Sequence, residues 1–172
     1  MTNRERTAGV LKQINRSNGG LPKRAVNGVV LLNEGGVEGD RQRNLKYHGG
    51  PAKAVLMVSA EFIDCLQARG FPVFYGALGE NFTVSGLDPH MWRAGQRYGI
   101  GDTAVIELTQ LRKPCVNLDV YGAPIKRELY DAQCKAGDFT SARWGHGGFY
   151  ARVVRSGLIF PDTPVILISD AA

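Results

Sequence analysis

The sequence predicts a mainly β fold, either a barrel or a sandwich. Its 22 glycines and eight prolines divide the 172 residues into short apolar segments. Turn residues recur roughly every 8–12 positions between these segments, which is typical of all-β domains and not of a doubly wound α/β sheet. We therefore expect one domain over residues 1–172, built from short strands with a few small helices.

The expected strands are segments in which branched and long apolar side chains dominate. In chain order they cover residues 8–14, 26–32, 53–59, 81–85, 96–100, 103–109, 149–154 and 164–169. A helix is expected over 61–69, because Ser59 can cap its N-terminus and Gly70 can end it. A second helix is expected over 124–133, because Pro124 suits the first turn of a helix.

The apolar runs are too short for a membrane protein. The longest cover residues 54–58 and 165–168, whereas a transmembrane helix needs about 20 apolar residues. At the N-terminus, Lys12 comes before any secretory apolar region can form. We therefore expect a soluble, cytoplasmic protein that does not bind membranes.

The charge is basic and unevenly distributed. There are 21 Lys and Arg against 16 Asp and Glu, a net charge of +5. Four windows hold 14 of the basic residues and none of the acids: residues 6–33, 41–60, 108–118 and 139–161. Such uncompensated stretches around Gly-rich loops suggest a site for an anion. The alternative is a solvated basic face without a ligand.

Three cysteines do not make a disulfide framework, and no CxxC or HExxH motif is present. A metal would therefore be held by very few protein atoms. Cys65 lies beside the apolar stripe of the helix over 61–69, so we expect it in the core. Nothing in the sequence distinguishes Cys134 from a bystander.

Cys115 is the cysteine with a chemical context. The strand over 103–109 runs into Arg112 and Lys113, and Pro114 then fixes a turn. Two nearby cations favour the thiolate, which attacks electrophiles or binds soft metals. The alternative is a small buried cysteine without a function.

Gly-rich loops with cations recur along the chain. In residues 35–51 two Gly doublets and Gly39-Asp40 bracket a basic run; its members are Arg41, Arg43, Lys46 and His48. Glycines let backbone N–H groups approach a ligand, so such a loop suits phosphate or another oxyanion. It is not a P-loop, and the alternative is a set of ordinary turns.

Three other segments have a similar composition. In residues 17–24, Lys23 follows a Gly turn. In residues 79–87, Asn81 stands at the start of a strand, and this segment is either a polar pocket wall or an ordinary turn. Residues 143–155 place His146 before a Gly doublet. Histidine can act as an acid or base near neutral pH, but a role in holding loops is the expected one for His146.

Read in order, several segments resemble the MOSC domain, named for the C-terminal domain of molybdenum-cofactor sulfurases. The matching segments cover most of the chain: 17–26, 36–55, 79–87, 95–115 and 147–159. The HGGP sequence at 48–51 and the R-x-P-C sequence at 112–115 are the specific ones. The pattern is most similar to small stand-alone bacterial members. Pro161-Asp162 replaces the Gly-Asp that the family usually has before its last strand.

The resemblance implies a MOSC-like β-barrel that binds a molybdenum–pterin cofactor. By the same resemblance, Cys115 is the catalytic residue and the protein ligand of molybdenum. The implied cofactor-binding residues are Lys23, Asp40, His48, Gly49, Gly50, Asn81 and Arg112. Pyridoxal phosphate is associated with the family, but it is not expected here. Such a cofactor brings its own sulfur ligands to the metal, so one cysteine from the protein is enough, which agrees with the absence of metal-binding motifs in the sequence.

The implied activity is reduction of N-hydroxylated bases or related N-oxygenated compounds. The electrons must come from an external donor, since no flavin or nicotinamide fingerprint is present. The alternative within the family is a sulfur carrier or cofactor-handling protein with a persulfide on Cys115. A basic β-barrel that binds nucleic acid is a further alternative, which the absence of an RNP-like aromatic cluster or basic helix disfavours.

Overall fold

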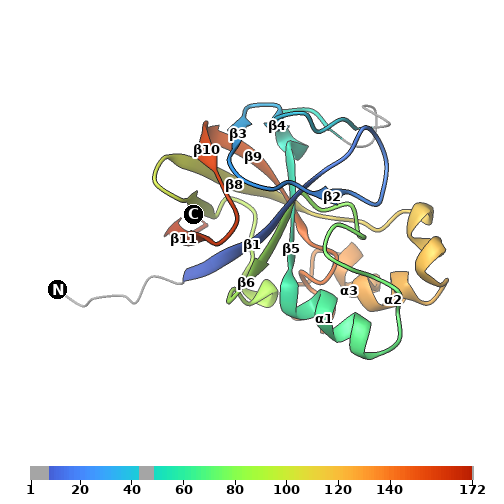
Figure 1. Cartoon of the computed structure of the whole chain (residues 1–172). Coiled ribbons are helices and arrows are strands. Elements are labelled where there is room, and N and C mark those ends of the chain that lie inside the picture. The colour runs from blue at the N-terminus through green and yellow to red at the C-terminus, as the bar shows by residue number, and fades with distance from the viewer. Residues whose placement is uncertain (1–7, 43–48, 172) are drawn as a thin grey trace.

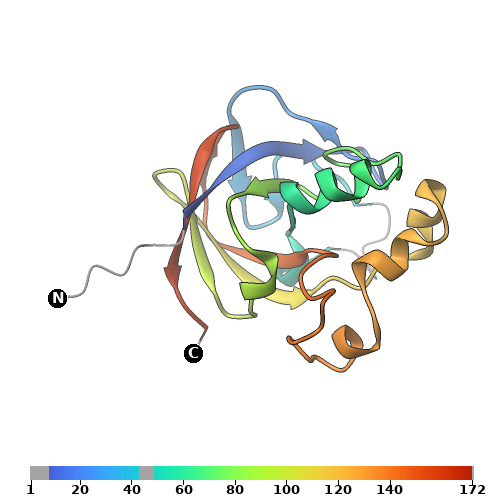
Figure 2. The ribbon, with the colours of Figure 1, turned by 90° about the horizontal axis from the view of Figure 1, so that it is seen from below.

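The chain forms a closed β-barrel in a computed structural model that describes residues 8–42 and 49–171. Seven strands surround the core within this part of the chain, and β11 pairs with β1 to close the ring. Around the barrel they are β11 (Thr163–Ser169), β7 (Arg97–Ile100), β8 (Ala104–Leu111), β9 (Phe149–Arg155), β5 (Val55–Ser59), β6 (Phe82–Ser85) and β1 (Ala8–Arg16). Figure 2 shows the curved strands of this barrel. The predicted mainly β barrel is therefore confirmed.

The remaining strands are short. β2 (Arg24–Ala25) pairs with the end of β1, and a three-stranded sheet contains β3 (Val30–Asn33), β4 (Gly36–Val37) and β10 (Gly157–Ile159). The single strand predicted over 26–32 is therefore wrong in extent. Gly28 interrupts it, because its φ of 82° belongs to the left-handed region and not to a strand.

The helix α1 (Ala60–Ala68) connects β5 to β6, which are parallel neighbours. The Phe62 N–H donates to Ser59 Oγ at 3.3 Å, so the predicted cap is present. The helix buries Phe62, Ile63 and Leu66, whereas Cys65 is exposed. The prediction of Cys65 in the core is wrong, because Cys65 lies on the solvent side of the helix.

The helix predicted over 124–133 divides into α2 (Ile125–Leu129) and α3 (Ala132–Lys135). Tyr130 between them is extended, with φ −164° and ψ 142°, and the Asp131 side chain accepts from Cys134 N–H at 2.8 Å to start the second helix. The 3₁₀ helices are η1 (Pro51–Lys53), η2 (Pro89–Met91) and η3 (Val116–Tyr121). Figures 1 and 2 show the three α-helices gathered toward one end of the barrel.

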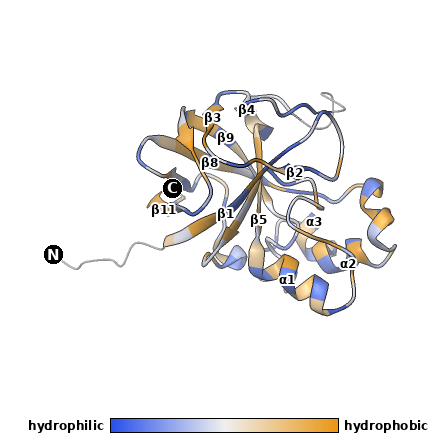
Figure 3. Cartoon of the chain, viewed as in Figure 1, coloured by the Kyte–Doolittle hydropathy of each residue, from blue (hydrophilic) through white to orange (hydrophobic). Residues whose placement is uncertain are grey.

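Two hydrophobic clusters stabilise this arrangement. One fills the barrel, with Leu11, Met57 and Ile106 among its members, and the other joins the barrel to the helices. Figure 3 shows apolar residues concentrated on the strands and helices, with more polar loops. Cys134 is only 4% exposed and belongs to the first cluster, so it is a core residue and not a bystander.

Within the described residues, no helix combines the length and the apolar character needed to cross a bilayer.

Candidate functional site

A pocket of about 680 Å³ opens beside the barrel where several loops meet. Its walls come from parts of the segments 20–23, 41–42, 78–81 and 110–117, with Lys53, Leu56 and Tyr150. Five Lys and Arg side chains line it. No Asp or Glu does so among the residues that the structure describes. The positive lining suits an anionic ligand.

Arg112 supplies one wall of this pocket. β8 runs through Leu111, after which the Arg112 N–H donates to Gly148 O at 2.9 Å and fixes the backbone. The Arg112 side chain is buried, with 3% of the residue exposed, and Nη2 donates to Leu78 O at 3.0 Å. Nε and Nη1 meet no acceptor with hydrogen-bond geometry in the described part of the chain. A buried donor without an acceptor is costly, so this guanidinium is suited to an anion from solution.

Cys115 follows on the same wall. It is half-buried, lines the pocket, and stands immediately before η3. Pro114 and the exposed Lys113 line the pocket beside it. The end of β8 therefore presents both Arg112 and Cys115 to one cavity, as the sequence predicts for the strand over 103–109.

Tyr150 on β9 lines the pocket opposite Gln110, its partner in the β8–β9 register. Burial raises the pKa of the Tyr150 hydroxyl, while the charge of Arg112 and a hydrogen bond with its side chain lower it, and Cys115 raises it. Lys53 Nζ lies 5.4 Å from the centroid of the Tyr150 ring. Sequence reasoning missed Tyr150, because a tyrosine in an apolar strand has no signal that separates it from a core residue.

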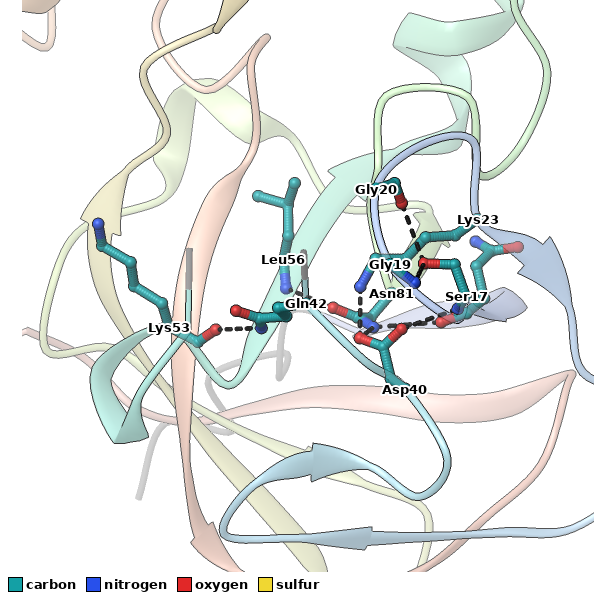
Figure 4. Close-up of polar contacts among 10 residues, drawn as sticks. Ser17, Gly19, Gly20, Lys23, Asp40, Gln42, Lys53, Leu56 and Asn81 are labelled. Carbon is teal, nitrogen blue, oxygen red and sulfur yellow. Dashed lines mark hydrogen bonds and ion pairs between the residues drawn. The ribbon is translucent and has the colours of Figure 1, made fainter. Parts of the chain in front are cut away.

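Another part of the pocket wall is held by a buried ion pair. Lys23 Nζ bonds to Asp40 Oδ2, and both side chains are less than a tenth exposed. Asn81 Nδ2 also donates to Asp40 Oδ2, at 2.8 Å, and the Ser17 N–H donates to Asp40 Oδ1 at 2.9 Å. Figure 4 shows these three groups around the Asp40 carboxylate. Burial lowers the pKa of Lys23, and Asp40 partly offsets this effect.

The segment around Lys23 lacks acids in sequence but not in space. Asp40 reaches it from the loop after β4 and compensates its charge. The expectation of an uncompensated cation at Lys23 is therefore wrong, because a loop distant in sequence supplies the acid. Asp40 itself lies behind Lys23 and is not part of the pocket lining.

The expected cofactor-binding residues are only partly brought together. Lys23, Asn81 and Arg112 share the pocket, whereas Gly49 and Gly50 are not among the described residues that line it. Gly50 precedes η1 with a φ of 79°, and a Cβ there would meet nothing within 4 Å. The prediction for His48 lies outside the described residues.

Glu80 is fully buried and lies between two pocket residues, Gly79 and Asn81. Its Oε1 accepts from the Gly76 N–H at 2.5 Å and from Thr83 Oγ1 at 3.1 Å. Its Oε2 has no hydrogen-bond partner among the described residues. Burial raises the pKa of Glu80 to about 7. Glu80 therefore supports the wall from behind and does not itself line the pocket.

His146 does not line the pocket. Its Nδ1 lies 3.2 Å from Glu128 O, and its ring stacks on Phe62 with centroids 4.1 Å apart. Burial lowers the pKa of His146. This geometry fits the expected role of His146 in holding loops together.

The described residues contain no cluster of three His, Cys, Asp or Glu that could hold a metal ion. Any metal next to Cys115 must therefore arrive with most of its ligands. A metal cofactor that has its own sulfur ligands and an anionic tail fits Cys115 and Arg112.

The family model of the MOSC domain matches residues 44–166, and the chain belongs to the MOSC family. It is 34% identical over 154 residues to the uncharacterized protein YflK of Bacillus subtilis. It is 30% identical over 154 residues to YiiM of Escherichia coli. In both comparisons, 87% of this chain is covered. The matched region is only 63% of the length of either relative.

A more distant relative from Gibberella moniliformis is named a reductase. It is 25% identical over 153 residues, which are 85% of this chain and 25% of that protein. Among solved structures, YiiM from Geobacillus stearothermophilus aligns with a TM-score of 0.67 and 26% identity. That alignment covers 94% of this chain and 75% of the other. These likenesses support the MOSC barrel found here.

Proposed function

We propose that this protein is a molybdenum-cofactor enzyme that reduces N-hydroxylated bases or related N-oxygenated compounds. One observation supports this more than any other: the buried guanidinium of Arg112, two of whose nitrogens have no hydrogen-bond acceptor among the described residues, shares one pocket with the half-buried thiol of Cys115. Membership of the MOSC family is consistent with a molybdenum cofactor. The fungal relative named a reductase is consistent with an oxidoreductase.

The residues fit the cofactor at its two ends. Arg112 would hold the phosphate, because its free N–H groups can make charge-assisted hydrogen bonds to a phosphate oxygen. Cys115 would supply a thiolate ligand to molybdenum, with the pterin dithiolene supplying the other sulfur ligands. When bound, the cofactor would supply two-electron redox chemistry, with the electrons coming from an external donor.

The overall reaction breaks the N–O bond, consumes two electrons and two protons, and releases water and the reduced base. Tyr150 is protonated at neutral pH, as tyrosine ordinarily is, and burial raises its pKa further. Its hydroxyl can therefore donate a hydrogen bond to a substrate in the pocket. Leu21, Leu56 and Leu78 line the same cavity, and their apolar surface excludes water from part of it.

A sulfur carrier is the second candidate. A half-buried cysteine in a pocket lined by cations would stabilise a persulfide anion as well as a thiolate. The two candidates use the same residue, but only the reductase requires molybdenum. They are therefore separated by what the purified protein contains.

The experiment is purification from a host that makes the cofactor, followed by elemental analysis and an activity assay. Turnover of an N-hydroxylated base is measured with reduced methyl viologen as electron donor. We expect molybdenum in the wild type, and turnover that falls to background in Cys115→Ala. Cys65→Ala is the matched control, since Cys65 is exposed on α1 and should keep full turnover.

Full turnover in Cys115→Ala would contradict the assignment of Cys115. Protein without molybdenum but with a persulfide on Cys115 would establish the sulfur carrier instead.

A further inference from the structure

Glu80 lies directly behind the pocket wall. None of its surface is exposed, and its chain neighbours Gly79 and Asn81 both line the pocket. The buried Arg112 side chain is tied to the same segment, because its Nη2 donates to Leu78 O at 3.0 Å. The segment that holds the guanidinium therefore also carries a buried carboxyl.

The two oxygens of the Glu80 carboxyl differ in their contacts. Oε1 accepts from the Gly76 N–H and from Thr83 Oγ1. Asn15 Nδ2 donates to Thr83 Oγ1 at 3.2 Å, so the Thr83 hydroxyl hydrogen is left to donate to Glu80. Oε1 is thus an acceptor in both charge states, and a proton on the carboxyl belongs to Oε2. Oε2 has no partner among the described residues, so no hydrogen bond within this part of the chain fixes the charge state of Glu80.

The charges around Glu80 come from three different elements. Lys23 precedes β2, Arg112 follows β8, and Tyr121 ends η3, and each of them interacts electrostatically with Glu80. Asp40 compensates Lys23, whereas Arg112 forms no ion pair in the described part of the chain. Burial raises the pKa of Glu80 to about 7, while its hydrogen bonds and the Arg112 charge lower it. The charge state of Glu80 at neutral pH therefore depends on how far the Arg112 charge is compensated.

We infer that Glu80 is a proton-linked positioning residue of the anion site: an anion on Arg112 draws a proton from solvent onto Glu80, and loss of that proton weakens the binding of the anion. The inference rests on the proposed function in one respect, the anion on Arg112, and it does not require molybdenum. The cause is competition for one positive charge. An anion compensates the guanidinium from the pocket, and an ionised Glu80 compensates it from behind. The coupling is reciprocal, so the anion favours the protonated carboxyl by the factor by which that proton favours the anion.

The direction of the pH dependence follows from this coupling. Below pH 7 most Glu80 is already protonated in the free protein, so binding takes up few protons. Above pH 7 binding must take up a proton, so the affinity for the anion falls. If the anion prefers the protonated form about tenfold, its affinity falls about sevenfold between pH 6 and pH 8.5. About half a proton is then taken up per anion at pH 7.5.

The test uses sulfate, because it stays a dianion over this pH range and has the tetrahedral oxygens of a phosphate. The full chain, produced in a host that does not make the cofactor, is titrated with sulfate by isothermal calorimetry at pH 6, 7.5 and 8.5. Ionic strength is held constant, and two buffers of different ionisation enthalpy at each pH measure the protons taken up. We expect the wild type to show the loss of affinity and the proton uptake given above.

Glu80→Gln keeps the size of the side chain and cannot ionise. Its affinity for sulfate should be nearly the same at the three pH values, with proton uptake close to zero. Glu107→Gln is the matched control, because Glu107 pairs with Arg97 and Arg152 and does not line the pocket. Cys115→Ser removes a titratable thiol from the pocket lining. Both of these variants should keep the wild-type pH dependence.

Thr83→Val tests the inference without removing the carboxyl, and serves where Glu80→Gln does not fold. It removes one donor to Glu80 Oε1, and that hydrogen bond lowers the pKa of the carboxyl. The midpoint of the pH dependence should therefore move to higher pH. A midpoint that stays at the wild-type value would overturn the inference.

Equal affinity for sulfate at pH 6 and pH 8.5, without proton uptake, would overturn the inference and leave the proposed function standing. A wild-type pH dependence in Glu80→Gln would also overturn it, as would loss of this dependence in Cys115→Ser. Sulfate binding that Arg112→Met leaves unchanged, or no binding at pH 6, would contradict the anion on Arg112. That result would count against the proposed function and the inference together.

Discussion

The two walls of the pocket differ in how their charges are satisfied. On one wall, Lys23 and Asp40 form a buried ion pair that Asn81 and the Ser17 backbone complete. On the other, Arg112 is equally buried but keeps two nitrogens without an acceptor among the described residues. The paired wall is stabilised by its own contacts. The unpaired wall has donors available for a ligand.

This difference teaches that a cation in a Gly-rich loop has two possible roles that sequence does not separate. Both Lys23 and Arg112 lie in segments without nearby acids. Only the fold shows that Asp40 lies beside one, and that the other forms no ion pair within residues 8–42 and 49–171. The two nitrogens of Arg112 without an acceptor among the described residues, and not the number of local cations, are the basis for proposing a ligand at this wall.

Breaking the paired wall should have the largest effect on stability. Asp40→Asn leaves the Lys23 ammonium buried without its carboxylate, so we expect a loss of about 3–5 kcal/mol in the free energy of unfolding. Urea unfolding at neutral pH measures this change. The control is Asp119→Asn, which removes a partly exposed ion pair with Lys126 and should cost less than about 1 kcal/mol. Similar costs for the two variants would contradict a structural role for the Lys23–Asp40 pair.

The buried carboxyl of Glu80 should make the stability of the folded protein depend on pH. Its pKa of about 7 in the folded protein is above the ordinary value, so the unfolded chain loses this proton at lower pH than the folded protein. Stability from this group is therefore complete below about pH 4.5 and is lost as pH rises toward 7, by about 3 kcal/mol in total. Glu80→Gln should flatten the pH dependence of Tm between pH 5 and 8.

Glu107→Gln is the control for Glu80. Arg97 and Arg152 lower the pKa of Glu107, so its contribution changes only in more acidic solution. If Tm of Glu80→Gln depended on pH as steeply as Tm of the wild type, the buried carboxyl of Glu80 would not be the group that causes this dependence.

The two other cysteines test whether burial alone separates structural from reactive thiols. Cys134 packs in the barrel core, with Sγ 3.4 Å from Ser141 Oγ, so Cys134→Ala should cost about 1–3 kcal/mol. Cys65→Ala should change stability by less than about 0.5 kcal/mol, because Cys65 is exposed. Denaturant unfolding of both variants checks this order. The reverse order would contradict the burial of the two side chains.

Much of the barrel was predictable because local composition determines it. The apolar run over 103–109 became β8, and the Ser59 cap began α1 as predicted. The errors come from single residues whose conformation depends on context. Gly28 ended a predicted strand with a positive φ, and the extended Tyr130 divided a predicted helix.

The candidate site was predictable at Arg112 and Cys115, because both follow directly from the end of one strand. Lys23 was also predicted and lines the pocket, but its pairing with Asp40 was not predictable, because Asp40 comes from another loop. Tyr150 was not predictable, because it carries no motif. These roles depend on contacts between segments that are distant in sequence, and the pattern of residues along the chain does not predict such contacts.

The most direct test of the account is Arg112→Met, measured for molybdenum content and stability together. Two nitrogens of Arg112 lack acceptors in the described part of the chain, so an apolar side chain of similar length should change the free energy of unfolding by less than about 1.5 kcal/mol. If the guanidinium holds the cofactor's phosphate, molybdenum per folded chain should fall at least about tenfold. A stable Arg112→Met protein with wild-type molybdenum content would contradict the claim that the unpaired wall binds the ligand.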